Sequence, residues 1–442
     1  MKGRRLTVVH LLLAFAFRLF FGLCSEFWLE DERQTYLLGL KFYATRAWPF
    51  FGPDVGVPSP HAIQQPGALQ GLVVGLPLFL LRVPEAPFLL LNLLSFAGLC
   101  LFAWYTSRRL PEVPRWFIWS WLLVAAPWTI NFSTHVVNLS YLLPAGTLFF
   151  IGVFETCTPL SKGLVAPRWS NFAMGAALLW VMQFHLSWVL LPPFVMLSLY
   201  FQWREGGGAG LLRACVWLAS GAALTGAFLA PTFIRYGLGE GLGGTQGTVG
   251  FNLGNLLHVY NLPEGVLGRF LSFASFELPR FIGDRTARRV EFFRETPWLI
   301  PFGLFLLVVG IAQPVAMFFT WFRRAGMPPD WPNIKRFTLA TVCLIYLSFL
   351  FASGKPPSAH TYYVMLPVAM MYGFYCWSPL LRKSFWRKFA LVVIACAVIF
   401  NAGQAMHSLR RKSLYVNRAV PAEAIERRDY TLLGERRPGV RY

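Results

Sequence analysis

The sequence predicts an all-helical protein that crosses a membrane many times, and three observations carry this prediction. Of its 442 residues, 56% are apolar and only 14% are charged, whereas soluble domains carry about a quarter charged residues. Several apolar runs, including 6–24, 88–105 and 298–321, approach the roughly 20 residues that cross a bilayer core. No window alternates as a membrane β-strand does, and backbone groups in lipid need partners inside their own segment. We therefore expect an all-α polytopic membrane protein.

The basic residues define the expected orientation. The net charge of +20 is concentrated in short clusters between apolar runs, such as 2–5, 108–109, 323–324 and 382–388. This is the positive-inside pattern of membrane proteins, and it argues against a nucleic-acid partner. The seven cysteines form no close pair, so neither a zinc site nor a disulfide framework is expected. No small-residue cleavage site follows the first apolar run, which favours a retained span over a signal peptide.

Placing the N-terminus inside orders the remaining elements. The first span is 6–24, and the first outer loop, 25–86, holds an expected helix at 31–45 and an interfacial helix at 67–82. The later spans are expected at 87–105, 115–131, 137–154, 171–184, 187–202, 212–233, 298–321, 337–353, 362–380 and 389–406. A second large outer loop covers 234–296. We thus expect a membrane domain at 1–406 with about eleven spans, followed by a basic tail, 407–442, whose side of the membrane stays open.

Three consecutive acids, Glu30, Asp31 and Glu32, follow the first apolar run. Neighbouring carboxylates repel one another, so such a cluster calls for a raised pKa or a nearby cation. A carboxylate at this position could act as a general base or bind a divalent cation through oxygen. The plainer reading is a solvated cap at the start of a helix. The residues by themselves leave both readings open.

The segment around the acids resembles a known family. "FWLEDERQTYLLGLKFYATRAWPFFGPDV" is similar to the first outer loop of the GT-C superfamily of membrane glycosyltransferases, with Trp28, Asp31, Glu32, Tyr36 and the turn 47–49 in matching places. The superfamily includes protein O-mannosyltransferases and lipid A aminoarabinose transferases. Further similar elements follow in the same order over most of 1–380, namely "QQPGALQGLVVGLPLFL", "THVVNLSYLLP", "MQFHLSWVLLPP" and "SAHTYYVMLPVAMMY".

The resemblance implies a GT-C-like fold and a glycosyltransferase. Such an enzyme moves a sugar from a polyprenyl-phosphate carrier to a lipid, glycan or protein acceptor, on the outer, periplasmic face of a bacterial plasma membrane. Asp31 is then the expected general base, with Glu32 beside it. The residues expected to bind the donor are Tyr36, Gln65, His185, Lys355, His360 and Tyr362, with Arg269 and Arg280 as further cations on the same side.

Two questions stay open on the sequence. Some relatives carry acids where this chain has Asn138 and Gln64–Gln65, so it is undecided whether Asp31 and Glu32 hold a divalent cation such as Mg²⁺ or Mn²⁺. A transporter or flippase of a lipid-linked cell-envelope precursor, or a scaffold without catalysis, could also present large outer loops. Transporters usually show repeated halves and ionisable groups at mid-membrane. We find no convincing repeat.

Overall fold

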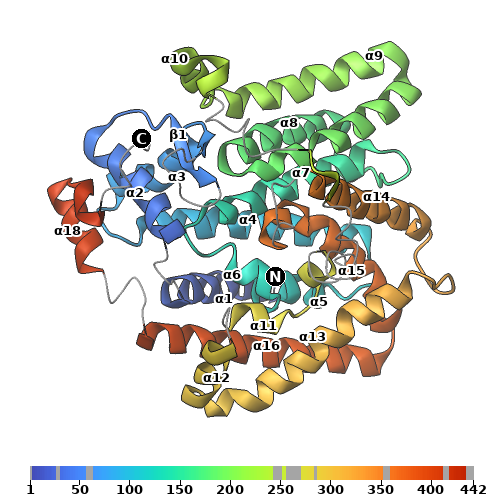
Figure 1. Cartoon of the computed structure of the whole chain (residues 1–442). Helices are drawn as coiled ribbons and strands as arrows, with labels where there is room; N and C mark the ends of the chain where they lie inside the picture. Colours follow the sequence, from blue (N-terminus) through green and yellow to red (C-terminus); the bar gives the residue numbers. More distant parts are fainter. Residues whose placement is uncertain are drawn as a thin grey trace.

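Helices make up most of the described chain. The computed structural model describes residues 2–25, 30–55, 63–241, 251–254, 270–282, 286–351, 359–411 and 418–434. In chain order the elements are α1 (Lys2–Ser25), α2 (Glu30–Thr45), β1 (Phe51–Val55), β2 (Ile63–Pro66), α3 (Leu69–Leu80), α4 (Ala86–Arg109), α5 (Arg115–Ser120), η1 (Trp121–Ala125), α6 (Pro127–Asn131), η2 (Asn138–Tyr141), α7 (Leu142–Thr156), α8 (Pro167–Phe184), η3 (Leu186–Leu190), α9 (Pro192–Gly226), α10 (Ala230–Gly241), η7 (Leu271–Ala274), α11 (Leu278–Phe281), α12 (Thr286–Glu295), η8 (Pro297–Leu299), α13 (Ile300–Thr320), α14 (Trp331–Phe349), η9 (Ala359–Met365), α15 (Leu366–Leu381), α16 (Ser384–Arg411), α18 (Ala419–Arg427) and η10 (Tyr430–Leu433) (Figure 1).

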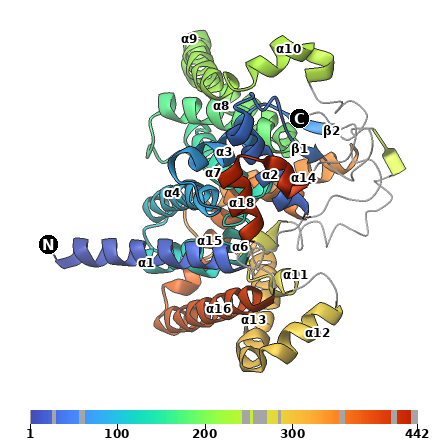
Figure 2. The same cartoon turned by 90° about the vertical axis from the view of Figure 1, so that its left-hand side faces the viewer.

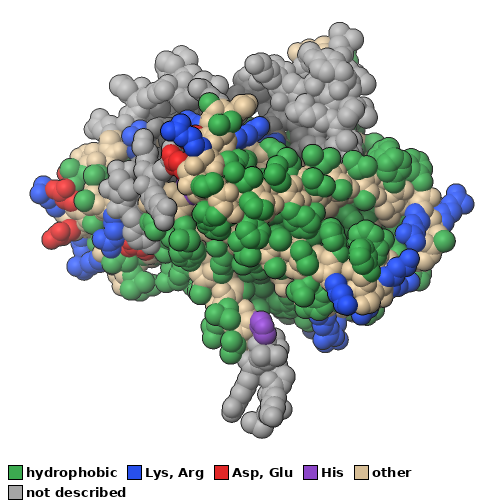
Figure 3. All heavy atoms as spheres, turned by 90° about the horizontal axis from the view of Figure 1, so that it is seen from below, with side chains coloured by type: hydrophobic (Ala, Val, Ile, Leu, Met, Phe, Trp, Pro, Cys, Tyr) green, Lys and Arg blue, Asp and Glu red, His purple; other side chains and the backbone are tan. Residues whose placement is uncertain are grey.

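The polytopic helical prediction is confirmed. Within the described residues, seven segments are long and apolar enough to cross a membrane by length and composition. One of them, Leu186–Gly226, is interrupted at Gly207, whose φ of +58° and ψ of −152° are not helical and suit a residue without a Cβ. The expected count of eleven spans therefore stays a prediction. A broad belt of hydrophobic side chains covers the face drawn in Figure 3, with lysine and arginine gathered near its edges.

The first loop and the C-terminal segment lie on the same side of the molecule. Glu85, at the start of α4, forms an ion pair with Arg418, at 2.6 Å from Oε1 to Nε. The Arg428 guanidinium lies 5.6 Å from the centre of the Tyr43 ring on α2. Figure 2 shows α18 beside α2, whereas the N-terminal end of α1 projects at the far left of this view. The tail described here thus shares the face of the first loop, a question that the sequence left open.

A break in the third expected span accounts for a buried arginine in the first. Pro127 begins α6 directly after the π-helical turn η1, so several carbonyls of η1 lack the usual helical donors. Arg18 of α1, which is fully buried, donates to the carbonyls of Leu123 and Thr129, each at 3.0 Å. Asn401 of α16 donates to Val124 O at 3.1 Å. Because lipid offers no hydrogen bonds, these side chains supply what the break removes.

A polar network closes the opposite end of the helix bundle. Arg109 is the last residue of α4, roughly 35 Å along the helix from Glu85. Its guanidinium contacts the Asp330 carboxylate at 2.9 Å and the hydroxyls of Tyr105 and Tyr375 at 3.1 and 2.9 Å. Lys162 also contacts Asp330, at 3.1 Å. Burial raises the pKa of Asp330, but the hydrogen bond from Tyr375 and these two cations outweigh it and hold the pKa below its usual range. This face therefore holds a saturated ionic network.

Candidate functional site

The acid pair expected as the reaction centre lies in the first turn of α2. Asp31 is exposed, whereas Glu32 is only 4% exposed and is engaged within the fold. The unpaired N–H groups and the positive end of the helix dipole stabilise carboxylates in a first turn. Asp31 is therefore the member of the pair that can meet a substrate from water. Glu32 is placed to hold the start of the helix.

Close packing fixes the position of α2. A Cβ on Gly39 would lie 2.4 Å from Val74 Cγ1 of α3, and one on Gly75 would lie 2.5 Å from the Gly39 carbonyl oxygen. The two helices can approach this closely only because both residues are glycine. Tyr36, fully buried, donates its hydroxyl to Pro84 O at 2.8 Å. This contact ties α2 to the α3–α4 turn, so Tyr36 has a structural partner, and its expected role towards the donor is untested.

Two histidines expected to bind the donor are brought together from distant parts of the chain. His185 follows α8 and His360 lies in η9; the charge of His360 adds to burial, which is the larger effect, in lowering the pKa of His185 to about 3. The His185 Nδ1 accepts a hydrogen bond from Ser187 N at 3.1 Å. In the neutral His185 ring the proton is therefore on Nε2, and this nitrogen is the one that can donate a hydrogen bond. Asn138 donates to the neighbouring Phe184 carbonyl at 3.3 Å.

An ion pair that the sequence analysis missed lies beside these histidines. Glu277, just before α11, accepts hydrogen bonds from Arg280 Nε at 3.0 Å and from Trp128 Nε1 at 2.8 Å. The guanidinium of Arg280 lies 5.3 Å from the centre of the Trp128 ring and acts electrostatically on His360. Phe132 stacks between them, with ring centroids 5.1 Å from Trp128 and 6.4 Å from His360. Arg280 was among the expected cations; Glu277 and Trp128 were not.

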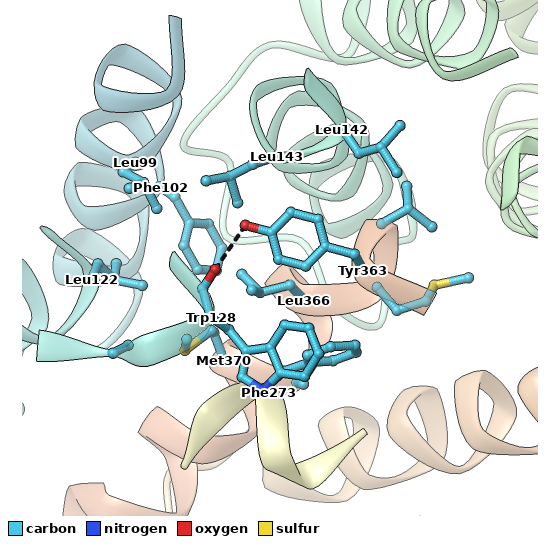
Figure 4. Close-up of a cluster of buried hydrophobic side chains, with 14 of the residues drawn as sticks. Leu99, Phe102, Leu122, Trp128, Leu142, Leu143, Phe273, Tyr363, Leu366 and Met370 are labelled. Carbon is cyan, nitrogen blue, oxygen red and sulfur yellow. Dashed lines mark hydrogen bonds between the residues drawn. The ribbon is translucent and has the colours of Figure 1, made fainter. Parts of the chain in front are cut away.

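Buried aromatic residues hold the Trp128 side chain that contacts this ion pair. Tyr363 donates its hydroxyl to the Trp128 carbonyl oxygen at 3.0 Å, as Figure 4 shows. Phe273 meets the Trp128 ring edge to face, at 4.7 Å between centroids. These residues come from α6, η7 and η9, so three elements together hold the Trp128 indole that orients Glu277. A signal was present in the sequence, because Glu277 and Arg280 stand three residues apart and are the only charged residues in the stretch 270–282.

The C-terminal end of α1 also reaches this region. Ser25 Oγ lies 3.0 Å from Nε2 of His135, a buried ring that stacks on Phe21. His135 is three residues after Phe132, which stacks on His360. Asp31 comes six residues after Ser25, so the chain allows it to lie at most about 22 Å from Ser25. The C-terminal ends of α1, α6 and α8 and the turn η9 thus supply polar groups to one region.

Gln65 lies in a separate buried polar group. It is 1% exposed, and neither its amide oxygen nor its amide nitrogen has a partner among the described residues. The next turn contains Gly67, whose φ of +107° favours glycine, and a Cβ there would lie 2.4 Å from the Gln183 side chain. Gln183 in turn donates to Thr225 O at 2.9 Å. The unpaired amide is compatible with ligand binding, but this contact set connects Gln65 with α8 and α9 rather than with the histidines.

The other expected residues contribute less. Tyr362 is buried, with its hydroxyl 3.1 Å from Ser348 Oγ of α14. Lys355 and Arg269 lie outside the described residues. Among the described residues, no three histidine, cysteine or acidic side chains cluster as metal ligands do. The described residues therefore do not form a metal site with three such ligands. The reaction proposed for Asp31 and Glu32 uses no divalent cation.

The arrangement of the helices identifies the fold of this chain. The chain has a GT-C-like polytopic membrane fold, which confirms the resemblance seen in the sequence. The crystal structure of ArnT from Cupriavidus metallidurans bound to undecaprenyl phosphate matches 96% of this chain and 76% of that chain, with a TM-score of 0.50 and 16% identity. At this identity the likeness shows a shared fold. No protein-family model matches the sequence, and the curated proteins give no significant match.

Proposed function

We propose that this protein is a membrane glycosyltransferase that moves a sugar from a polyprenyl-phosphate carrier to an acceptor at the outer face of a bacterial plasma membrane. The observation that supports the proposal is the exposed Asp31 beside the buried Glu32, on a helix that follows the first span and packs closely against α3. The shared fold supports it, since the matching ArnT structure is bound to undecaprenyl phosphate.

The proposed reaction is a single displacement. A hydroxyl or amine of the acceptor attacks the anomeric carbon from the side opposite the phosphate, while Asp31 accepts the acceptor's proton. The new bond to the anomeric carbon forms as the bond from that carbon to the phosphate oxygen breaks, and polyprenyl phosphate leaves with the bonding electron pair. A positioned base of this kind contributes about 10² to 10⁴ in rate.

The leaving phosphate needs donors whose hydrogen bonds strengthen as charge develops. We assign Arg280 and the Nε2–H of His185 as the donors to this phosphate. His360 interacts electrostatically with both residues and so links them. Glu277 holds the Arg280 guanidinium against Trp128. The Arg280 side chain is therefore already ordered, and phosphate binding costs less conformational entropy. Gln65 and Tyr362 keep the expected role of contacting the sugar or its carrier.

Transport of a lipid-linked precursor is less well supported. A transporter places ionisable groups where they bind substrate at mid-membrane. The buried cation of the first span, Arg18, instead donates to the backbone carbonyls exposed by the break before α6. That contact explains its presence without a transported ion or substrate.

The substitution Asp31→Asn tests the proposal. Lipid and glycan extracts of cells that make the wild-type chain should contain a product heavier by one sugar unit, measured by mass spectrometry. Asp31→Asn should keep the fold, judged by gel filtration and thermal unfolding, and lose this product at least 10²-fold. Glu205→Gln, at an exposed acid in the middle of α9, is the matched control and should retain it. Full product formation by Asp31→Asn would refute the role of this carboxylate.

A further inference from the structure

The C-terminal segment 418–434 folds back onto the first loop. It consists of α18, a turn at Arg428 and Asp429, and the short helix η10. Both α18 and η10 contact α2, and Figure 1 shows α18 at the edge of the molecule beside α2. We call residues 418–434 the C-terminal strap.

Two cation–aromatic contacts join the strap to α2 in opposite directions. The Arg428 guanidinium of the strap lies 5.6 Å from the centre of the Tyr43 ring on α2. Lys41, two residues earlier on α2, places its Nζ 5.7 Å from the centre of the Tyr430 ring in the strap. A cation over an aromatic face is attracted by the ring quadrupole. Because each side supplies one cation and one ring, the two contacts together define how the strap lies on α2.

The backbone of the strap bends between these two contacts. Arg428 ends α18 in the left-handed conformation, with φ of +53° and ψ of +37°, where glycine is the favoured residue. Asp429 donates its N–H to Ala424 O at 3.0 Å, and its carboxylate accepts from Thr431 N at 3.0 Å, which starts η10. Strain of this kind persists where surrounding contacts hold it. Here the contact that glycine could not make is the one between the Arg428 guanidinium and Tyr43.

Tyr43 connects the strap with the packing of α2 on α3. Its ring is only 1% exposed and meets Phe79 of α3 edge to face, at 5.0 Å between centroids. The same ring therefore contacts α3 through Phe79 and the strap through Arg428. Loss of the strap would remove one of the supports of α2, the helix whose first turn carries the acid pair.

A second contact fastens the start of the strap to the start of α4. Arg418 Nε and Nη2 lie 2.6 and 3.2 Å from the two carboxylate oxygens of Glu85, a two-point arrangement that fixes the guanidinium in orientation. Glu85 follows Pro84, whose carbonyl oxygen accepts the hydroxyl of Tyr36 on α2 at 2.8 Å. Both ends of the strap thus meet residues that position α2.

The strap itself buries little apolar surface. Its buried side chains are those of Pro421, Ala424, Ile425 and Leu433, and the rest of the strap is half-buried or exposed. Segments with few buried apolar contacts open locally, at a lower free energy than the core of the protein. Attachment of the strap therefore depends strongly on its cation–aromatic contacts and its ion pair, and loss of these contacts leaves the packing of the other helices in place.

We propose that the C-terminal strap is a detachable restraint on α2. It docks through the reciprocal contacts of Arg428 and Lys41 and through the ion pair of Arg418 with Glu85, and docking limits the motion of α2. Undocking frees α2 and leaves the helical bundle folded. The strap can act in this way whether or not Asp31 is a general base, so the proposal goes beyond the proposed function.

Hydrogen–deuterium exchange of the purified full chain in lipid nanodiscs, read peptide by peptide by mass spectrometry, tests the proposal. We expect Arg428→Gln combined with Tyr430→Leu to raise exchange about tenfold in the strap and in α2, because both cation–aromatic contacts are lost. Exchange in α7 and α15 should stay unchanged. Arg428→Lys should restore part of the protection. Arg427→Gln is the matched control, because the neighbouring Arg427 pairs with Glu423 inside α18, and it should change nothing.

Charge reversal tests the second contact. Glu85→Arg and Arg418→Glu should each raise exchange in the strap, and the double variant, which rebuilds the ion pair with opposite signs, should lower it again. A strap that exchanges faster while α2 does not would overturn the restraint on α2. Faster exchange throughout α7 and α15 would show that the strap is part of the core and does not detach. Unchanged exchange in all variants would overturn the docking contacts. Loss of sugar transfer in Asp31→Asn leaves these measurements unchanged, so the two proposals fail separately.

Discussion

Glu277 and Arg280 form an ion pair three residues apart, 3.0 Å between Oε1 and Nε, directly over the indole of Trp128. The pair places an acid and a cation beside the aromatic residues at the start of α11, whereas the buried Arg18 of α1 serves backbone carbonyls. It also leaves the remaining guanidinium nitrogens of Arg280 beside His360, on which the cation acts. In the proposed reaction this is where the phosphate leaves.

Replacing Arg280 should slow transfer without unfolding the protein. We expect Arg280→Gln to lower kcat/KM for the polyprenyl-phosphate donor by about 10²-fold, because a donor to developing charge is worth this much. Arg280→Lys keeps the charge but loses the planar fork, so it should recover only part of the rate. Arg323→Gln, at an exposed arginine in the turn after α13, serves as control. Unchanged kinetics of Arg280→Gln would remove this residue from the site.

The stability of the protein should depend on pH through His135. Burial lowers the pKa of His135 to about 4, against about 6.5 for an unfolded histidine. Between these values the unfolded state binds more protons, so the free energy of unfolding falls as pH falls from 6.5 to 4. The loss is on the order of 3 kcal/mol. Thermal unfolding in detergent at pH 7.5, 6, 5 and 4.5 measures it.

A histidine variant isolates that contribution. His135→Gln should unfold with a shallower pH dependence than the wild type, because glutamine keeps a polar contact with Ser25 but takes up no proton. His10→Gln, at an exposed position early in α1, should leave the slope unchanged. If the two variants and the wild type have parallel profiles, the acid sensitivity comes from other groups.

Arg18 should be needed for stability more than for catalysis. Arg18→Leu leaves the carbonyls of Leu123 and Thr129 without their donor, and we expect it to cost about 3 kcal/mol of unfolding free energy. Asn401→Leu, which removes a weaker pair of contacts on the same break, should cost about 1–2 kcal/mol. Leu12→Ala, at a side chain that is 62% exposed, should change little. A midpoint of thermal unfolding for Arg18→Leu equal to that of the wild type would contradict this explanation.

Labelling from one side of the membrane tests the orientation. In a variant without the seven native cysteines, Thr45→Cys at the end of α2 and Arg427→Cys in α18 should both react with an impermeant maleimide added outside the cell. Lys383→Cys, between α15 and α16, should react only after the membrane is opened. Reaction of Thr45→Cys and Arg427→Cys from opposite sides would contradict the packing of α18 on α2.

Some features of the site followed from the sequence and others did not. The acid pair, the helix that carries it and the following helix α3 were expected close to where they lie, because their signals are local runs of polarity and turn residues. The strand pair β1–β2, antiparallel with Phe51 opposite Pro66, was expected only as a turn-rich stretch. Its strands are five and four residues long, too short for a clear alternating pattern.

The contacts between the site residues could not be predicted from local sequence signals. His185 and His360 are far apart in the chain, and Trp128 meets Glu277 across 149 positions. The tail 418–434 looked out of place by charge alone, and its contacts with Glu85 and Tyr43 put it beside the first loop.

The sequence by itself determined that this protein is helical and crosses a membrane, because length and apolar content are local properties that the bilayer selects directly. It also determined that the acids follow directly after the first apolar run. Only the tertiary structure decided that Glu277, Arg280 and Trp128 form one group beside the histidines. The reason is physical: in lipid, apolar surface does not specify a partner, so the pairing of helices depends on close backbone approach at glycines and on hydrogen bonds that satisfy buried polar groups.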